Sequence, residues 1–393
     1  MSATRPARLL VVALLGWGLA ACQSQPSTTA PTVPAAATAA PTTAPAATTA
    51  AATAAPAAAT AAPTADAEAD LSGIKTYLTG KTGELQQATA QLKAASDRYY
   101  GLAQAANFDY AALWRDQGSA AKAAVEEARA AWMTASPSYE QMEGIVAGTP
   151  ALAQFDVDLD AGASGAEGGD TVVSFDLALP NGTTLPKPGN LFGVTESTLW
   201  GTDPAYRAPS VEADFDGNGT VEFGEALPDA NVLKGGVDTL DAQAAALAQA
   251  AAQWQPTPSD AFTSLVVMVP TMNEYFASWK SSRFVAGEQS EQRDFVAISR
   301  LADIQDILSS LQVVHKGVSP LIQQADPAED RAIGEGLERL SGFVGGIYQQ
   351  EQGGKRFTPE EADVFGVEAQ EQATAITGRV TQIAAQLQIP IQE

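Results

Sequence analysis

Apolar residues recur at steps of three and four along most of this 393-residue chain, which is the spacing that lines one face of an α-helix. The first such pattern opens near Ala69 and includes Ile74, Leu85 and Leu92. It continues to about residue 102 without a strong helix breaker, so we predict a long amphipathic helix there.

Two more helices are predicted before residue 149. An alanine-rich stretch over 110–133 carries its apolar residues on one side. Ser136 and Pro137 then supply a helix cap and a proline suited to a first helical position, which predicts a separate third helix through Ile145.

The helical pattern is interrupted over 149–190. The stretch 171–186 has strand-like spacing and contains Asn181 and Gly182, a pair that favours a tight turn. We predict a small β-hairpin inserted into a helical protein.

Helical spacing returns after residue 230. We predict helices over 233–254, over 259–279 with Ser259 as cap and a break at Pro270, and over 289–314, followed by two that begin with capping boxes near Asp326 and Thr358. The predicted fold class is therefore all-α, with two antiparallel bundle halves over 69–190 and 231–393 joined by a central segment, 191–230.

The N-terminus has the pattern of an export signal. Arg5 and Arg8 precede a short apolar run that ends in Leu-Ala-Ala-Cys, and Cys22 stands where the bacterial lipobox places the acylated cysteine. An ordinary signal peptide or an uncleaved anchor would share most of this pattern. We expect a lipoprotein signal peptide over 1–22, a membrane anchor through lipid on Cys22, and an extracytoplasmic protein at the cell surface or in the periplasm.

The next segment, 23–68, consists almost wholly of Ala, Thr and Pro. Repeated proline blocks helix and the lack of large apolar side chains leaves nothing to bury, so we predict a disordered tether.

The formal charge of −24 argues against nucleic acid as a partner. One cysteine excludes an intrachain disulfide, and one histidine, His315, excludes a site that needs two imidazoles. We expect a monomer.

The sharpest chemical motif is DFDGNGTVEFGE, residues 214–225, which agrees with the EF-hand calcium pattern at each position. Gly219 would make the bend and Val221 would point into the protein. Pro209 and Pro228 curtail the flanking helices, so we expect a structural Ca²⁺ site rather than a sensor. An acidic surface loop that imitates the pattern is the alternative. The predicted ligands are Asp214, Asp216, Asn218, Thr220, Glu222 and Glu225.

Several segments, in order, resemble the imelysin family, the helical peptidase-like domain of bacterial iron-uptake lipoproteins of the EfeO and EfeM type. They are ARAAWMTASPSYEQMEGIVAG, FDVDLD, FGVTESTLWG and an Ala/Leu helix ending in AAQW. The resemblance implies two four-helix bundles facing a cleft. It also implies a metal site built from a G-x-H-x-x-E signature and acids in neighbouring segments.

The signature is incomplete in this chain. Glu196 matches its glutamate, but Gly193 stands at the histidine position and offers no donor atom. Carried over, the remaining acids would form an oxygen-only site suited to Fe³⁺, Ca²⁺ or Mg²⁺. The alternative is that these acids are ordinary solvated, capping or loop carboxylates. The candidate residues are Glu140, Glu143, Asp156, Asp160 and Glu196.

Three functions fit the sequence. The first is a lipid-anchored binding protein for iron or another metal, with an iron permease or other transport partner. The second is a divergent imelysin domain that has lost the metal and binds another ligand or a protein. The third, a metallopeptidase, is disfavoured because no metal-bound water or alternative nucleophile is visible, and we assign no catalytic residue.

Overall fold

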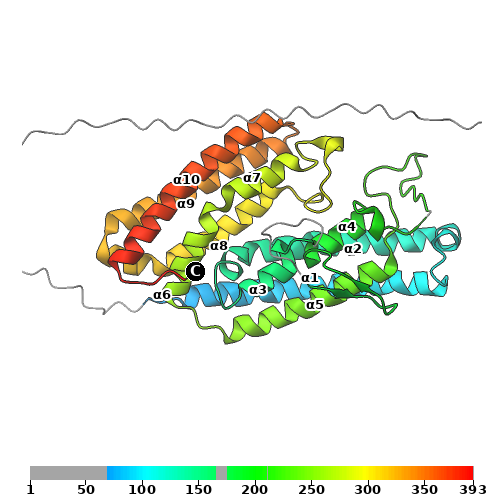
Figure 1. The fold of residues 1–393 in the computed structure, drawn as a ribbon, viewed down its shortest axis with the longest axis horizontal. Helices are drawn as coiled ribbons and strands as arrows, with labels where there is room; N and C mark the ends of the chain where they lie inside the picture. Colours follow the sequence, from blue (N-terminus) through cyan, green and yellow to red (C-terminus); the bar gives the residue numbers. More distant parts are fainter. Residues whose placement is uncertain (1–68, 165–174, 210, 393) are drawn as a thin grey trace, which may run out of the picture. The chain divides into compact units, whose positions relative to one another are not determined.

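The computed structural model describes residues 69–164, 175–209 and 211–392, which lie within one compact unit. Cys22, the tether and the first residues of the expected hairpin lie outside the described residues. The all-α fold class is confirmed, since long helices dominate (Figure 1). The sheet contains only two short strands within the described residues. Among the described residues, no helix combines the length and apolar composition needed to cross a membrane.

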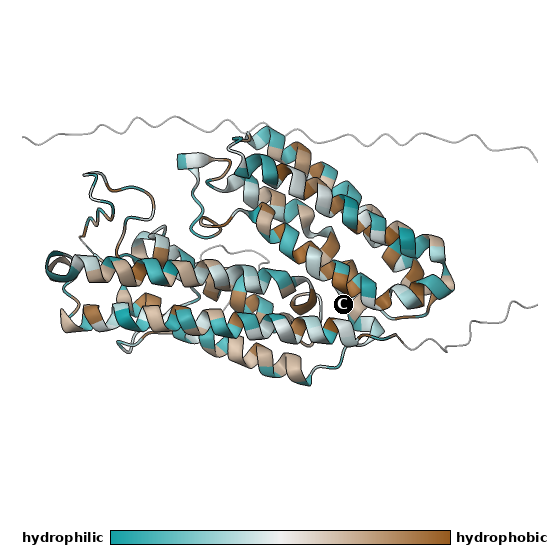
Figure 2. Cartoon of the chain, turned by 180° about the vertical axis from the view of Figure 1, so that it is seen from behind, coloured by the Kyte–Doolittle hydropathy of each residue, from teal (hydrophilic) through white to brown (hydrophobic). Residues whose placement is uncertain are grey.

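Four helices form a first group. Helix α1 packs against α2 and α5, and the short α4 packs against α5 and α2. Their apolar faces meet in the core while polar residues cover the outside, and Figure 2 shows both kinds of position on the long helices. The four helices are α1 (Ser72–Ala105), α2 (Tyr110–Val146), α4 (Leu191–Trp200) and α5 (Ala230–Gln253).

The remaining helices form a second group around α8 and α10. Helix α8 packs against α9 and α6, α10 packs against α7 and α9, and α8 also contacts α2 of the first group. A 3₁₀ turn, Val269–Thr271, contains Pro270 and separates α6 from α7 as expected. The helices are α6 (Pro258–Met268), α7 (Met272–Ser281), α8 (Arg300–Ala325), α9 (Pro327–Gln352) and α10 (Pro359–Gln386).

The expected helix break at Ser136 and Pro137 is wrong. Helix α2 runs through Pro137 to Val146. A proline inside a helix removes one N–H donor and costs stability. The hydroxyl of Ser138 donates to the Thr134 carbonyl at 2.8 Å, and Trp132 and Tyr139 on either side are buried, so core packing continues across the proline.

The segment after α2 is partly helical and partly a hairpin. The acidic run that includes Asp156 and Asp160 forms α3 (Ala153–Asp156) and a π-helical turn, η1 (Val157–Ala161). The hairpin prediction is confirmed for the described strands, β1 (Leu177–Ala178) and β2 (Thr184–Leu185), which pair antiparallel. Gly182 adopts φ of +83° in the turn, which glycine tolerates without strain.

Two further helix boundaries differ from expectation. The cap of α6 is Thr257, not Ser259, because Thr257 and Asp260 form a reciprocal capping box. Helix α8 begins at Arg300, not near residue 289, because Ser299 caps it and Glu196 holds the backbone N–H groups of 295–297 in a non-helical loop. Capping starts for the last two helices are confirmed at Asp326 and Thr358, although only Thr358 belongs to a reciprocal box.

Candidate metal centre

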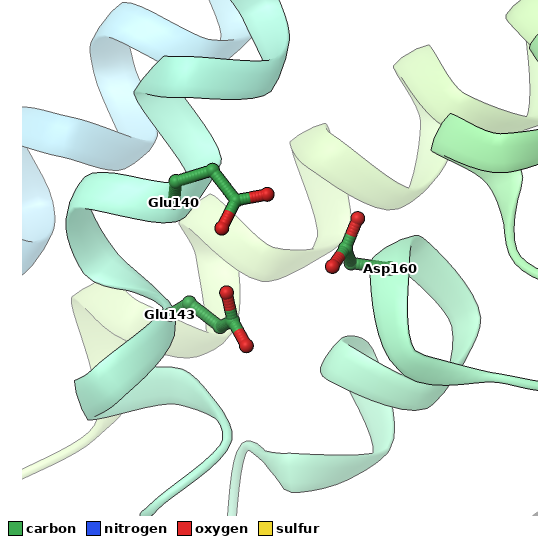
Figure 3. Close-up of side chains that lie close together, drawn as sticks. All are labelled: Glu140, Glu143 and Asp160. Atoms are coloured by element: carbon green, nitrogen blue, oxygen red, sulfur yellow. The ribbon is translucent and has the colours of Figure 1, made fainter. Parts of the chain in front are cut away.

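Three carboxylates from two segments converge inside the protein. Glu140 and Glu143 lie one turn apart on α2, and Asp160 comes from the π-helical turn η1. One oxygen of each lies within 4.8 Å of the others, and Figure 3 shows the three side chains directed toward a shared space. The sequence therefore identified three acids that the fold brings together.

Two oxygens of this group lack any partner. Glu140, Glu143 and Asp160 are 2–4% exposed, so water does not solvate them freely. Oε2 of Glu140 and Oε2 of Glu143 have no hydrogen-bond partner in the described part of the chain. A buried carboxylate oxygen without a hydrogen-bond partner lowers the stability of the fold, so this geometry suits a bound cation.

Asp156 lies beside this group and is held by a tyrosine. The buried phenol of Tyr139 donates to Oδ1 of Asp156 at 2.6 Å. Burial raises the pKa of Asp156 to about 8, with a further contribution from the Glu143 charge, while the Tyr139 hydrogen bond and Arg300 oppose the rise. Asp156 therefore retains a proton near neutral pH when the site holds no added positive charge.

Helices α7 and α8 complete the surroundings of the three acids. Tyr275 donates from its phenol to Oε1 of Glu143 at 2.8 Å. Nη1 of Arg300 lies 3.0 Å from Oδ2 of Asp303 and 3.9 Å from Oε1 of Glu140. We use the name acidic cluster for the five carboxyl groups of Glu140, Glu143, Asp156, Asp160 and Asp303.

The electrostatics of the acidic cluster favour an added cation. Burial, reinforced by neighbouring carboxylates, holds the pKa of Glu140 and of Asp160 well above the ordinary range. Burial also raises the pKa of Asp303 to about 6, although Arg300 opposes this. Arg300 supplies one positive charge for five carboxyl groups, so full ionisation of the cluster needs further positive charge.

Glycine at position 144 allows the two helices that carry the cluster to pack closely. A Cβ atom at Gly144 would collide with Oγ of Ser310 and touch the side chain of Leu311, both on α8. Because α2 can approach α8 here, Glu140 and Glu143 lie near Arg300 and Asp303. The π-helical turn inserts an extra residue per turn, a feature found often at functional sites, and it presents Asp160 inward.

Glu196 does not join the acidic cluster. Its two carboxylate oxygens accept hydrogen bonds from the backbone N–H groups of Phe295, Val296 and Ala297 at 2.6–3.0 Å. Burial raises its pKa to about 8 against the effect of these bonds. The role that the structure assigns to the signature glutamate is to hold a loop.

Gly193 lies next to Asp294 of the same loop. A Cβ atom at residue 193 would approach Oδ2 of Asp294 to 2.8 Å and Oδ1 of Asn190 to 3.0 Å. Asp294 and Asn190 thus occupy the space into which a side chain at position 193 would extend. Gly193 is also held by its backbone, since its N–H donates to Oδ1 of Asn190 at 2.6 Å.

The EF-hand-like loop, residues 214–225, is held by hydrogen bonds between its carboxylates and its own backbone. Asp214 accepts from the N–H groups of Gly217, Asn218 and Gly219, and Glu225 accepts from those of Phe215, Asp216 and Glu222. Oxygens of Asp214, Asp216 and Glu225 lie within 4.8 Å of one another. These bonds lower the pKa of both Asp214 and Glu225, so the carboxylates are ionised.

Helix α2 anchors this loop. Phe215 stacks on Trp114 with ring centroids 5.5 Å apart, and Nζ of Lys122 donates to the Phe215 carbonyl at 2.6 Å. Arg129 donates to the carbonyls of Leu199 and Gly224. The prediction that Val221 points into the protein is wrong, because Val221 is 46% exposed. Its position pairs with a second loop in tandem EF-hands, and no such loop faces it among the described residues.

His315 lies far from a helix end and outside the acidic cluster. It sits within α8, and its Nε2 is 3.1 Å from Oδ1 of Asp330 on α9. The partly buried imidazole therefore packs between α8 and α9.

Sequence reasoning missed three residues of the centre, Tyr275, Arg300 and Asp303. A signal for the last two was present, because they share a face with Ile304, Ile307 and Leu311, which form the apolar stripe of α8. Charged residues three apart on an apolar stripe predict a buried ion pair. Tyr275 had no comparable signal, since its partner lies 132 residues away.

Comparison with known proteins bears on this geometry. A family model described as Imelysin matches residues 33–389 of the chain. A search of curated proteins finds no match.

Proposed function

Because this chain belongs to the imelysin family, we propose that it binds a metal cation at the acidic cluster. The observation that carries the proposal is the pair of buried, unpartnered oxygens, Oε2 of Glu140 and Oε2 of Glu143, beside Asp160. A cation bound among them would supply the positive charge that these carboxylates lack.

The donor set determines the kind of cation. All donors of the acidic cluster are oxygens, which suit hard cations such as Fe³⁺, Ca²⁺ or Mg²⁺ rather than Zn²⁺ or Cu²⁺. Fe³⁺ carries the highest charge of the three and would offset the largest part of five carboxylates. We therefore propose Fe³⁺ as the preferred cargo.

The proposed cellular role rests on the predicted export signal. We propose a lipoprotein anchored through Cys22, with the folded part held outside the cytoplasm on the tether 23–68. Such a protein would collect iron or another metal and pass it to a permease or other transport partner. We propose that it acts as a monomer without nucleic acid.

The EF-hand-like loop has a separate role in this proposal. Ca²⁺ bound by Asp214, Asp216, Asn218, Thr220, Glu222 and Glu225 would stabilise the central segment, since the loop is anchored to α2 through Phe215. Its six proposed ligands are distinct from those of the acidic cluster, so the two sites can be removed separately.

Calorimetric titration of the full chain with Fe³⁺ as its citrate complex tests the metal proposal. A Glu225→Gln background weakens cation binding by the loop, so that binding at the acidic cluster can be measured apart from it. In that background we expect one Fe³⁺ site that is lost in Glu143→Gln and retained in the control Glu368→Gln, an exposed glutamate on α10. Absence of Fe³⁺ binding in the background chain, or equal binding in Glu143→Gln, contradicts the proposal.

A second candidate function is a divergent imelysin domain that binds another ligand or a protein. Gly193 favours it, because Asp294 and Asn190 fill the space beside it and Glu196 is committed to the 295–297 loop. The same titration separates the two functions: a chain that binds no Fe³⁺, Mg²⁺ or Ca²⁺ at the acidic cluster in the Glu225→Gln background fits the second.

A further inference from the structure

A hollow of about 850 Å³ lies beside the EF-hand-like loop, and no residue of the acidic cluster lines it. Five separate segments line it, namely α2, the end of α4, the EF-hand-like loop, the stretch after α7 and the connection between α9 and α10. Its volume falls in the range of about 300–1,000 Å³ found for small-molecule sites.

The lining contains apolar side chains that the fold leaves uncovered. Met133 is 40% exposed and Phe223 is 42% exposed, and both line the hollow together with Trp200, Phe284 and Val285. Exposed large apolar side chains that gather in one place indicate a binding surface, whereas scattered ones do not.

Two arginines in the same hollow lack an acidic partner. No ion pair of Arg283 or of Arg356 is found in the described part of the chain, although acids outnumber bases 46 to 22. Burial and the neighbouring positive charge of Arg356 lower the pKa of Arg283. Glu288 also lines the hollow but forms no ion pair with either arginine among the contacts described.

One arginine is already positioned against an aromatic ring. The guanidinium of Arg283 lies 3.2 Å from the centroid of the Phe223 ring. Stacking leaves the edge of the guanidinium, where its N–H donors lie, free to meet an oxyanion. The hollow therefore combines a planar apolar wall with adjacent unpaired cationic donors.

We propose that this hollow binds a small amphipathic anion, an apolar or aromatic body that carries a carboxylate or sulfonate group. Arg283 and Arg356 bind the anionic group, and Met133, Phe223 and Val285 contact the apolar body. This site is additional to the proposed metal function and does not depend on it.

The walls of the hollow are held before any ligand arrives. Val296 and Ala297 line it, and their N–H groups donate to Glu196. Arg129 holds another part of the wall by donating to the carbonyls of Leu199 and Gly224, next to the lining residues Trp200 and Phe223. A preorganised site loses less entropy on binding than a flexible one. The signature glutamate and the EF-hand-like loop thus shape the same hollow.

Binding of 1-anilinonaphthalene-8-sulfonate to the full chain, followed by fluorescence and calorimetry, tests the proposal. We expect one saturable site whose affinity falls about tenfold or more in Arg283→Gln/Arg356→Gln, since two charge-assisted contacts are lost. The control Arg115→Gln/Arg339→Gln removes the same charge from exposed arginines elsewhere and should leave affinity unchanged. Equal loss in both double variants, or no saturable site, overturns the proposal.

Two further measurements test the apolar part. Decanoate should displace the probe, whereas sulfate at the same concentration should not, because sulfate lacks an apolar body. Ala297→Trp fills the hollow without a change of charge and should weaken the probe about tenfold. The proposal is overturned if sulfate displaces the probe as well as decanoate does, or if Ala297→Trp binds the probe with unchanged affinity. Fe³⁺ titration of the arginine double variant should be unchanged, so failure here is distinct from failure of the metal proposal.

Discussion

The phenol of Tyr275 on α7 donates to Oε1 of Glu143 on α2 at 2.8 Å, while Oε2 of the same carboxylate has no partner. Tyr139 holds one oxygen of Asp156 in the same way. In metal sites, a hydrogen bond to one carboxylate oxygen commonly fixes the orientation of the group, and the other oxygen then faces the metal. The two tyrosines therefore orient carboxylates of the proposed metal site without occupying the space between them.

Tyr275→Phe should lower Fe³⁺ affinity by about 10- to 100-fold, the usual effect of losing a residue that orients a metal ligand. The substitution keeps the ring that packs beside Arg300 and removes only the donor. Calorimetric titration in the Glu225→Gln background measures the change. The control Tyr99→Phe removes a buried phenol that donates to the Pro228 carbonyl, so it should affect stability and leave Fe³⁺ affinity intact. Equal affinity in Tyr275→Phe contradicts this role.

Arg300→Gln should have opposite effects on stability and on metal binding. Arg300 is the positive side chain between Glu140 and Asp303. Its loss should therefore lower the free energy of unfolding of the metal-free protein by about 3 kcal/mol. Removing a cation close to the metal should raise Fe³⁺ affinity by about tenfold or more. Urea unfolding and calorimetry measure the two quantities. A residue with only a structural role would lower both, and that outcome contradicts the prediction.

The metal-free protein should lose stability as pH rises. The pKa of Asp156 is about 8 and that of Asp303 about 6 in the folded chain, whereas both lie near 4 when unfolded. The folded state therefore holds more protons than the unfolded state between pH 4 and pH 8. The stability that these protons contribute is fully present below about pH 4 and is lost as the pH rises through 6 and 8. We expect the free energy of unfolding to fall by on the order of a few kcal/mol between pH 5 and pH 8.5 in the presence of chelator.

Asp156→Asn should flatten that profile, because the amide cannot ionise yet can still accept from Tyr139. The exposed Glu212→Gln is the matched control and should follow the wild-type curve. Saturating Fe³⁺ should remove most of the pH dependence below pH 8, since the cation replaces the protons. A stability that rises with pH in the metal-free chain would refute the account of buried, protonated carboxyl groups.

Local spacing explains why two acids of this centre lie together. Glu140 and Glu143 are three residues apart in a helix, so they share a face wherever the helix lies. Their role as metal ligands, like that of Asp160, was predicted only through the family resemblance, and the inward direction of Asp160 depends on a π-helical turn that spacing does not indicate. Tyr275 and Arg300 reach the centre through the packing of α7 and α8, which short-range pattern does not specify.

Glu196 illustrates the opposite case. The segment LFGVTESTLW is buried along nearly its whole length, and a buried glutamate needs partners, but the sequence does not identify them. The partners are backbone N–H groups about one hundred residues later in a loop that the apolar pattern predicted as helix. A residue can therefore match a family motif and still have a different role in this chain.

Glu196→Ala should destabilise the fold without removing the metal site. Three hydrogen bonds to a buried carboxylate are lost, so we expect the free energy of unfolding to fall by about 3 kcal/mol or more. Fe³⁺ stoichiometry, measured at a temperature where the variant remains folded, should stay the same because Glu196 is not among the converging carboxylates. Glu143→Gln is the comparison that removes the site. Loss of Fe³⁺ binding in Glu196→Ala with folding intact would restore the role that the resemblance implies.

Terbium, which takes the same oxygen ligands as Ca²⁺, should report on the EF-hand-like loop. Trp114 stacks on Phe215 and lines the same surface as Asp214 and Asp216, so excitation of tryptophan should sensitise Tb³⁺ emission. Glu225→Gln removes the predicted bidentate carboxylate and should weaken Tb³⁺ and Ca²⁺ by about tenfold or more. At a Ca²⁺ concentration one hundred times its dissociation constant, the free energy of unfolding should rise by about 2.7 kcal/mol.

The control Glu212→Gln changes an exposed residue just outside the loop and should bind Tb³⁺ and Ca²⁺ as the unmodified chain does. Trp114→Phe should lose the emission yet keep calorimetric Ca²⁺ binding, and an unchanged affinity in Glu225→Gln would show that the loop only imitates the calcium pattern.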